Sequence, residues 1–252
     1  GFNFSPNIKL SKNFPQAYCT WGQTAENVAD KYQITKNDQN QFAYNSHMKT
    51  LAAKKNNNFK DEIIKIKVND NIVTDDECVR KNTTFESLSL LKSAFVENGS
   101  VTAGNSSPLT DGATAILVCS KDYAKENELT ILAKIKSVAV HGCDPDYMGL
   151  GPIGATKKAL QRASLTIKDI GIVELNEAFA SQSIACVREL GIDEEKLNID
   201  GGAIAIGHPL GATGARITGK AASLLKRENV EFALATQCIG SGQGLTTILE
   251  AV

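Results

Sequence analysis

The amino-acid sequence predicts a layered α/β fold for the larger, carboxyl-terminal part of the chain. From about Asp111 onward, short apolar runs alternate with amphipathic segments, as strands do when helices connect them. The hydrophobic content of 42% over 252 residues is enough to bury a substantial core. The six cysteines contain no C-x-x-C pair, so they indicate neither a zinc site nor a disulfide-rich secreted domain and favour a reducing compartment.

The first part of the chain, up to about residue 108, is polar and less regular. We expect Thr24 to cap a short helix through Tyr32, and Thr35 to cap a longer helix. The apolar face of the longer helix should consist of Tyr44, Met48, Leu51 and Ala52. The segment 62–68 alternates apolar residues with lysine, which predicts a half-solvated strand. Residues 69–108 are irregular, which is unusual in a compact domain unless the loops bind a ligand.

The second part of the chain carries the alternating elements. Apolar runs expected as strands occupy residues 113–119, 131–140, 172–175, 197–199, 232–236 and 245–249, and helices are expected over 156–163, 179–190 and 212–226. The sequence shows no clear short repeat and no low-complexity tract. This pattern predicts one sheet with helices packed against it.

The charge balance and the hydropathy of the chain restrict its partners. The 27 basic and 28 acidic side chains nearly cancel, so no overall field attracts nucleic acid or an anionic membrane surface. No apolar run approaches the roughly 20 residues of a spanning helix, so we expect no membrane span. Because the chain begins with Gly1 rather than Met, we expect residues to precede it in the full protein, and targeting is only weakly constrained.

Three segments interrupt the α/β pattern where strands are expected to end, the place at which open sheets carry their sites. His208 stands in a Gly-His-Pro turn after a strand-like run, where Pro209 fixes the backbone, although a lone histidine is usually structural. Asn176 lies between a strand and a helix, where it could cap the helix or orient a water or a substrate carbonyl. Cys238 opens a glycine-rich turn that exposes it, whereas a cysteine at a strand end is more often buried and inert.

Two nucleotide-binding interpretations fail on their own structural requirements. The run Gly240-Ser241-Gly242-Gln243-Gly244 is followed by another strand, whereas a dinucleotide loop opens a helix. The stretch 207–216 lacks the Gly-Lys-Ser/Thr of a phosphate-binding loop. The glycines are better explained by backbone N–H groups that face a ligand oxygen.

Taken together, these segments closely resemble the thiolase family. The matching runs are Asn176-Glu177-Ala178-Phe179, the run from Gly201 to Gly211, and the run from Cys238 to Gly244, preceded in the family's order by Thr24 to Val28, Val101 to Ser107 and Asp111 to Ala113. The resemblance covers essentially the whole chain. It implies a thiolase fold, in which a layered αβα domain carries an inserted loop domain. Residues 1–108 would form the CoA-binding loop domain, 109–131 a returning piece of an otherwise mostly missing amino-terminal domain, and 132–252 the carboxyl-terminal domain.

The resemblance implies a two-step acyl transfer. A cysteine of the amino-terminal domain attacks 3-ketoacyl-CoA, acetyl-CoA leaves, and a second CoA takes the acyl group. His208 resembles the base that activates both thiols, and Cys238 resembles the acid/base at the acetyl carbon, for which a lowered thiol pKa is expected. Asn176 resembles the residue that holds a water in an oxyanion hole, and the Gly240 N–H would serve a second hole. Coenzyme A is a substrate, and neither a cofactor nor a metal is implied.

The resemblance also implies residues that contact CoA and the acyl group. They are Arg80, Ser87, Phe95, Ala103 and Ser107 along the CoA path, with Ala178 and Phe179 at the acyl end. The simpler interpretations are a solvated charge for Arg80 and a core aromatic for Phe95. Family members are usually homodimers or tetramers, and a cytoplasmic location is expected here.

Two departures from the family pattern modify this expectation. None of Cys19, Cys78, Cys119, Cys143 and Cys186 lies in the context of the nucleophile, so this chain alone is expected to be inactive. Thr20-Trp21 replace a His-Met pair of short-chain biosynthetic relatives, which favours a degradative 3-ketoacyl-CoA thiolase of fatty acid β-oxidation. One alternative is a 3-ketoacyl-carrier-protein synthase, but that class has a histidine or asparagine in place of Cys238. The other is a non-catalytic thiolase-like protein that binds CoA or lipid.

Overall fold

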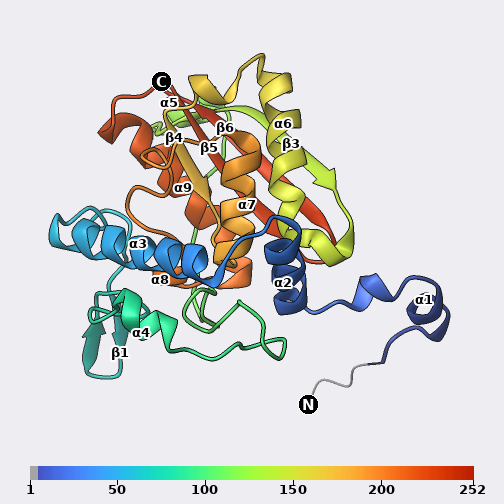
Figure 1. Ribbon diagram of the computed structural model, residues 1–252. Helices are drawn as coiled ribbons and strands as arrows, with labels where there is room; N and C mark the ends of the chain where they lie inside the picture. Colours follow the sequence, from blue (N-terminus) through green and yellow to red (C-terminus); the bar gives the residue numbers. More distant parts are fainter. Residues whose placement is uncertain (1–4) are drawn as a thin grey trace.

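The computed structural model describes residues 5–252, and its centre is a mixed four-stranded sheet in the order β3-β6-β5-β4 (Figure 1). The strands are β3 Lys134–Gly142, β4 Ile172–Leu175, β5 Phe232–Ile239 and β6 Gln243–Glu250. Strands β4 and β5 run parallel, while β5 pairs with β6 and β6 with β3 in antiparallel register. The parallel pair brings the carboxyl ends of β4 and β5 to the same edge.

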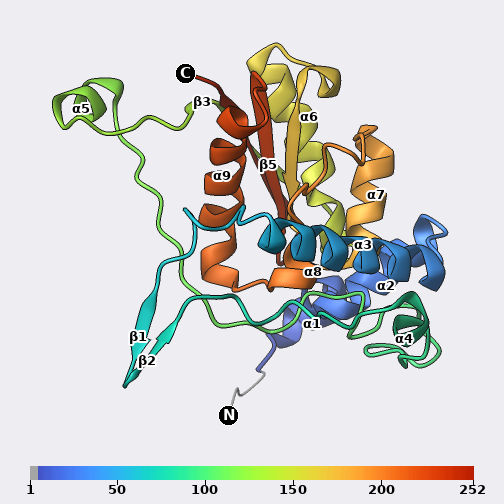
Figure 2. The ribbon, with the colours of Figure 1, turned by 90° about the vertical axis from the view of Figure 1, so that its left-hand side faces the viewer.

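Helices cover both faces of this sheet, as Figure 2 shows in side view. Helices α6 Gly151–Ala163 and α7 Ala180–Leu190 pack on one face, where Leu175, Leu234 and Ile248 enter their apolar cluster. Helix α9 Leu210–Arg227 packs on the other face. Successive strand residues point to opposite faces, so the strands supply both clusters. The predicted layered α/β domain is therefore confirmed.

The remaining elements are short or belong to the first part of the chain. They are α1 Ile8–Asn13, η1 Pro15–Tyr18, α2 Trp21–Lys31, α3 Lys36–Lys55, β1 Ile66–Val68, β2 Asn71–Val73, α4 Phe85–Ser89, α5 Lys121–Glu126, η2 Pro145–Leu150, η3 Ile167–Asp169 and α8 Ala203–Ile206. Strands β1 and β2 form an exposed hairpin that projects from the body in Figure 2. Strand β1 is shorter than the predicted strand over 62–68.

Helix α2 begins earlier than predicted. Thr20 caps it, because the Thr20 hydroxyl accepts the Gln23 N–H at 3.3 Å, whereas Thr24 lies inside the helix. The prediction that Thr24 caps this helix was wrong, because a threonine one turn earlier occupies the cap position. The predicted cap of α3 is confirmed, since Thr35 and Asp38 form a reciprocal capping box.

The buried face of α3 also differs from the predicted one. Tyr44, Met48 and Leu51 are only half-buried and Ala52 is exposed. The buried positions are Gln39, Asn40, Ala43, Ser46, His47, Thr50 and Ala53. Helix α3 crosses the edge of the sheet at α8 (Figure 2). There the Ser46 hydroxyl of α3 donates to Glu177 and accepts the Gly202 N–H. Hydrophobic periodicity does not detect such a polar interface.

Three apolar runs do not form the expected strands. The strand prediction for residues 197–199 was wrong, because Leu197 makes only an isolated bridge to Val173. Residues 113–119 are extended and exposed, with Leu117 71% exposed, and no strand within residues 5–252 pairs with them. A strand requires a partner for its backbone groups, so the strand prediction for this run was wrong. The strand-like run before His208 is the short helix α8.

Candidate active site

Asn176 follows the last residue of β4 and is fully buried. Its backbone N–H donates to the Thr236 carbonyl of β5 at 2.9 Å, which extends the parallel pairing by one residue. Its side-chain Nδ2 lies 3.3 Å from Nε2 of His208. Helix α7 begins at Ala180, so Asn176 is not the cap that the simpler interpretation expected. Its side chain instead faces the imidazole.

His208 is held between the short helix α8 and the long helix α9. Gly207 precedes it with φ +95°, and a Cβ there would lie 2.4 Å from Thr110 Oγ1, so the turn requires glycine. Pro209 is the residue before α9, and Thr213 lies in the first turn of that helix. The His208 Nδ1 atom is 2.7 Å from the Thr213 hydroxyl. The imidazole is therefore fixed from both of its nitrogens.

The hydrogen bonds around His208 define its neutral tautomer. The Thr213 hydroxyl donates to the Pro209 carbonyl at 3.0 Å, so its oxygen accepts the proton of His208 Nδ1. Nε2 then carries the lone pair and accepts the Asn176 amide N–H. Burial lowers the pKa of His208, and the charge of Arg216 lowers it further. A neutral imidazole with a lone pair on Nε2 can act as a general base.

The side-chain oxygen of Asn176 has no hydrogen-bond partner among the described residues. Asn176 Oδ1 is buried and accepts no hydrogen bond from any residue in 5–252. A buried acceptor without a partner costs about 1–3 kcal/mol unless a water or a ligand satisfies it. Asn176 can therefore donate to His208 and accept from a bound molecule at the same time.

Cys238 lies one residue before the end of β5 and is partly buried. It packs against an apolar cluster that contains Met148, Ala178 and Phe179. Burial raises the pKa of Cys238 to about 12, with a smaller contribution from Cys143. The predicted lowering of this thiol pKa was wrong, because apolar groups surround the sulfur. The thiol keeps its proton at neutral pH and can donate it.

The glycine-rich turn after Cys238 approaches the start of α2. A Cβ on Gly240 would lie 3.1 Å from Trp21 Nε1, so the indole packs close to the backbone of the turn. A cavity of about 400 Å³ opens beside this contact, and its lining includes Trp21, Thr24, Met148 and Ser241. Within residues 5–252, no side-chain hydrogen bond joins Cys238 to His208 or Asn176, so their convergence stays a prediction.

Four of the seven residues expected to bind CoA or the acyl group lie together. The Ser107 N–H donates to the Ala178 carbonyl at 3.0 Å. The rings of Phe95 and Phe179 meet edge to face with centroids 5.8 Å apart. Phe95 is 48% exposed, which argues against a purely core role.

The other three expected residues, Arg80, Ser87 and Ala103, are exposed. The Arg80 N–H donates to Nδ1 of His47 at 3.5 Å, so its backbone is tied to α3. Ser87 caps its own helix, because its hydroxyl accepts the Thr84 N–H at 3.1 Å and completes a capping box on α4. The role of these three residues in CoA binding stays a prediction.

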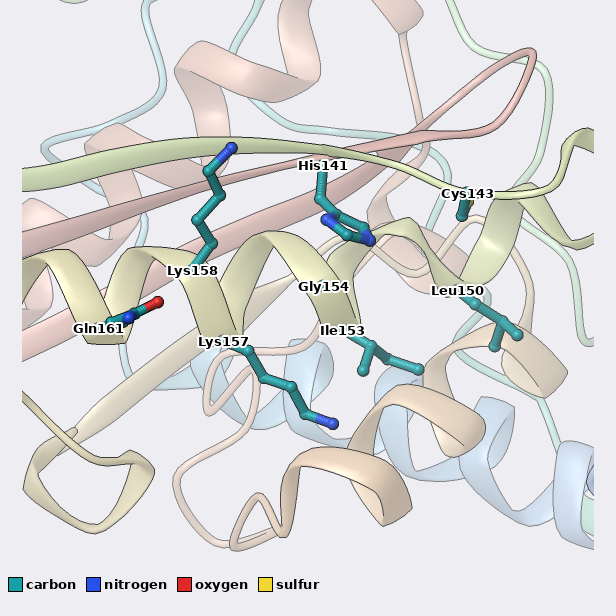
Figure 3. Close-up of a pocket in the computed structure, with 8 residues that line it drawn as sticks. All are labelled: His141, Cys143, Leu150, Ile153, Gly154, Lys157, Lys158 and Gln161. Carbon is teal, nitrogen blue, oxygen red and sulfur yellow. The ribbon is translucent and has the colours of Figure 1, made fainter.

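Sequence reasoning missed Thr213 as a site residue. Its position one turn after the Gly-His-Pro run was the available signal, because the first turn of α9 brings the Thr213 hydroxyl back to His208 Nδ1. Within residues 5–252, no cluster of three or more potential metal ligands occurs, and no helix is long and apolar enough to cross a membrane. A second cavity of about 510 Å³ lies between β3 and α6, where His141, Lys157 and Lys158 line it (Figure 3). It contains none of the predicted site residues.

Comparisons with known proteins agree with this geometry. Residues 10–122 match the family model of the thiolase N-terminal domain, and residues 129–251 match that of the thiolase C-terminal domain. The 3-ketoacyl-CoA thiolase of Photobacterium profundum is 48% identical over 261 residues, covering 100% of this chain and 67% of that protein. The 3-ketoacyl-CoA thiolase of Bacillus subtilis is 44% identical, covering 97% of this chain and 66% of that protein.

Solved structures give the same result. Human mitochondrial 3-ketoacyl-CoA thiolase in complex with CoA superposes with a TM-score of 0.92 at 40% identity, covering 100% of this chain and 65% of that one. Bacillus anthracis acetyl-CoA acetyltransferase superposes with a TM-score of 0.88 at 41% identity, covering 92% of this chain and 60% of that one. The fold is the thiolase fold, and the chain belongs to the thiolase family. It spans about two thirds of the length of the curated relatives it matches.

Proposed function

We propose that this chain carries the proton-transfer groups of a degradative 3-ketoacyl-CoA thiolase, which cleaves 3-ketoacyl-CoA with CoA to acetyl-CoA and a shortened acyl-CoA. The observation that supports this most strongly is the pair of contacts that hold the His208 ring, from Nδ1 to the Thr213 hydroxyl at 2.7 Å and from Nε2 to Asn176 Nδ2 at 3.3 Å. The names of the relatives support the acyltransferase class.

Each group has a defined task in this proposal. His208 Nε2 takes the proton of the attacking thiol, which makes the sulfur nucleophilic. When the bond between C2 and C3 of the substrate breaks, its electron pair moves onto C2 as an enolate of the acetyl thioester. Asn176 Oδ1 holds a water whose second O–H stabilises one oxygen that gains charge, and the Gly240 N–H stabilises another. Protonated Cys238 donates its proton to C2.

We propose further that none of the six cysteines accepts the acyl group. Cys238 serves as the acid/base, and the sequence context of the family's nucleophile surrounds none of Cys19, Cys78, Cys119, Cys143 and Cys186. Burial raises the pKa of Cys19, Cys143 and Cys186, which suppresses their nucleophilic thiolate forms. Cys119 lies on the exposed run 113–119. The chain by itself is then expected to bind CoA thioesters and exchange protons at C2, without completing acyl transfer. In this exchange His208 Nε2 takes the proton of the Cys238 thiol, the thiolate so formed removes a proton from C2 of acetyl-CoA, and a solvent deuteron returns to C2 by the same groups.

The organisation of the chain is part of the same proposal. Residues 1–108 form a loop domain that binds CoA, with Arg80, Ser87 and Ala103 along its path, residues 109–131 belong to the amino-terminal domain, and residues 132–252 form the carboxyl-terminal domain. The packing of Phe95 and Ser107 beside Phe179 supports a binding role for this loop region. We also propose a cytoplasmic homo-oligomer.

Two measurements on the 252-residue chain test this function. Exchange of the C2 protons of acetyl-CoA in D₂O, followed by NMR, is expected for the wild type and is expected to drop about 100-fold in Cys238→Ala. Binding of CoA is measured from the fluorescence of Trp21, the single tryptophan of the chain, which lies beside Gly240.

The two readouts separate the competing functions. Exchange by the wild type that Cys238→Ala abolishes, with CoA binding retained, supports the enzyme. CoA binding without any exchange supports the non-catalytic CoA-binding alternative. If Cys238→Ala keeps both C2 exchange and CoA binding, Cys238 has no role in the mechanism.

A further inference from the structure

The residue next to Asn176, Glu177, has a carboxylate in an unusual environment. It is 2% exposed, and within residues 5–252 no lysine or arginine forms an ion pair with it. Its Oε2 atom accepts the Ser46 hydroxyl at 2.7 Å and the Ile204 N–H at 3.1 Å. Its Oε1 atom accepts the Asn198 amide at 2.7 Å. Burial raises the pKa of Glu177, and these three neutral donors act against that rise.

Each of these three groups can only donate a hydrogen bond to Glu177 and cannot accept one from it. The Asn198 amide is fixed, because its Oδ1 accepts the Leu175 N–H and its Nδ2 also donates to the Leu175 carbonyl, both at 2.9 Å. The Ser46 oxygen accepts the Gly202 N–H at 3.1 Å, so its proton remains for Glu177. The third donor, at Ile204, is a backbone N–H. Both oxygens of Glu177 must therefore accept, which an ionised carboxylate satisfies and a side-chain amide does not.

The three donors come from segments that meet at the site. Ser46 lies on α3, Asn198 binds the end of β4, and Ile204 lies in α8, four residues before His208. A Cβ on Gly202 would lie 2.2 Å from Glu177 Cδ, so the backbone of this segment rests directly on the carboxylate. The bonds of Glu177 therefore connect the strand that carries Asn176 with the segment that carries His208.

We propose that Glu177 is a positioning residue: its buried carboxylate fixes segment 202–208 to the end of β4 and so sets the contact between Asn176 Nδ2 and His208 Nε2. The catalytic meaning of this contact rests on the proposed function, whereas the contact itself does not. A side chain that only stabilised the fold would leave the tautomer of His208 unchanged once the protein is folded. Glu177 instead determines whether Nε2 has its amide donor.

The test uses Glu177→Gln in the full chain with ¹⁵N-labelled histidine. Only three histidines are present, so the His208 nitrogens are assigned by comparison with His208→Asn. The side-chain amide of the variant places N–H groups against a fixed donor, so segment 202–208 must move. We expect the His208 Nε2 resonance to leave the position of a hydrogen-bonded lone pair, and C2 exchange to fall about 100-fold, the effect of a misplacement of about 1 Å.

Glu174→Gln is the matched control, because Glu174 is a second buried carboxyl on the same strand. Its Oε1 has no partner within residues 5–252, and burial raises its pKa to about 8, so the group is already neutral at pH 7. We expect the His208 resonances of this variant to match the wild type. An unshifted His208 in folded Glu177→Gln overturns the proposal.

A second variant keeps the proposal testable if Glu177→Gln does not fold. Ser46→Ala retains the carboxylate and removes one donor and the acceptor of the Gly202 N–H, so a smaller shift of His208 Nε2 in the same direction is expected. An unchanged His208 in Ser46→Ala would then refute the positioning role. If the His208 resonance shifts in these variants but the wild type exchanges no C2 protons, the positioning role is retained and the proposed function is rejected.

Discussion

Replacing Thr213 by valine tests the orientation of His208 most sharply. Valine keeps the shape of threonine but removes the oxygen that accepts His208 Nδ1–H at 2.7 Å. Thr213 is 1% exposed, so water cannot easily replace the lost acceptor. A buried N–H without a partner costs about 1–3 kcal/mol. This penalty falls on the one tautomer that leaves the lone pair on Nε2.

The magnitude follows from the tautomer equilibrium. The other tautomer places a proton on Nε2, where it meets the Asn176 amide donor at 3.3 Å, so neither form is well accommodated in Thr213→Val. Since about 1.4 kcal/mol is a factor of ten, C2 exchange should fall about 10- to 100-fold. The control Thr213→Ser keeps the hydroxyl and should stay within about threefold of the wild type. Equal rates for the valine and serine variants would refute the assigned tautomer.

Three further predictions concern a thiol, a buried cation and a buried acid. Because burial raises the pKa of Cys238 to about 12, iodoacetamide should alkylate it far more slowly than exposed Cys119 at pH 8, as peptide mapping would reveal, and equal rates would contradict the burial. Lys220→Met removes one of the two cations that pair with buried Asp200, while Arg227 remains, and should lower the free energy of unfolding in urea by about 2 kcal/mol. Lys136→Met, at an exposed pair, should cost less than about 1 kcal/mol. The raised folded-state pKa of Glu174 favours its neutral form, so its contribution to stability is complete below about pH 4.5 and is lost as pH rises toward about 8. In this range the free energy of unfolding should decline by about 1.4 kcal/mol per pH unit, and Glu174→Gln should remove the decline. An unchanged slope of the free energy of unfolding against pH in the variant would argue against the raised pKa.

The strands and helices of the second part were predictable because burial there is apolar. Strand β4 matches the predicted residues 172–175, and α7 and α9 match within two residues, since these segments alternate or repeat at the period of their structure. The run 113–119 shows the limit of this reasoning. Its apolar composition predicts a strand, but a strand depends on a neighbour, and composition does not specify one.

The candidate site was predictable only in part. The motif residues Asn176 and His208 were identified, and the structure brings their side chains into contact. The role of Glu177 was not predictable, because it depends on donors at positions 46, 198 and 204 that only the folded chain brings together. The raised pKa of Cys238 was missed for a similar reason, since the apolar groups around it come from distant segments.

The pH dependence of C2 exchange, compared between the wild type and His208→Asn, tests the central role of the imidazole most directly. Burial lowers the pKa of His208 below its ordinary 6.5, so the neutral base is fully present at pH 7 and is lost only as the pH falls through the lower value. We predict a wild-type rate that is constant around pH 7 and decreases in acid, and a rate at least about 100-fold lower in His208→Asn. An asparagine variant that exchanges as fast as the wild type, with the same acid limb, would contradict the role of His208 as the base.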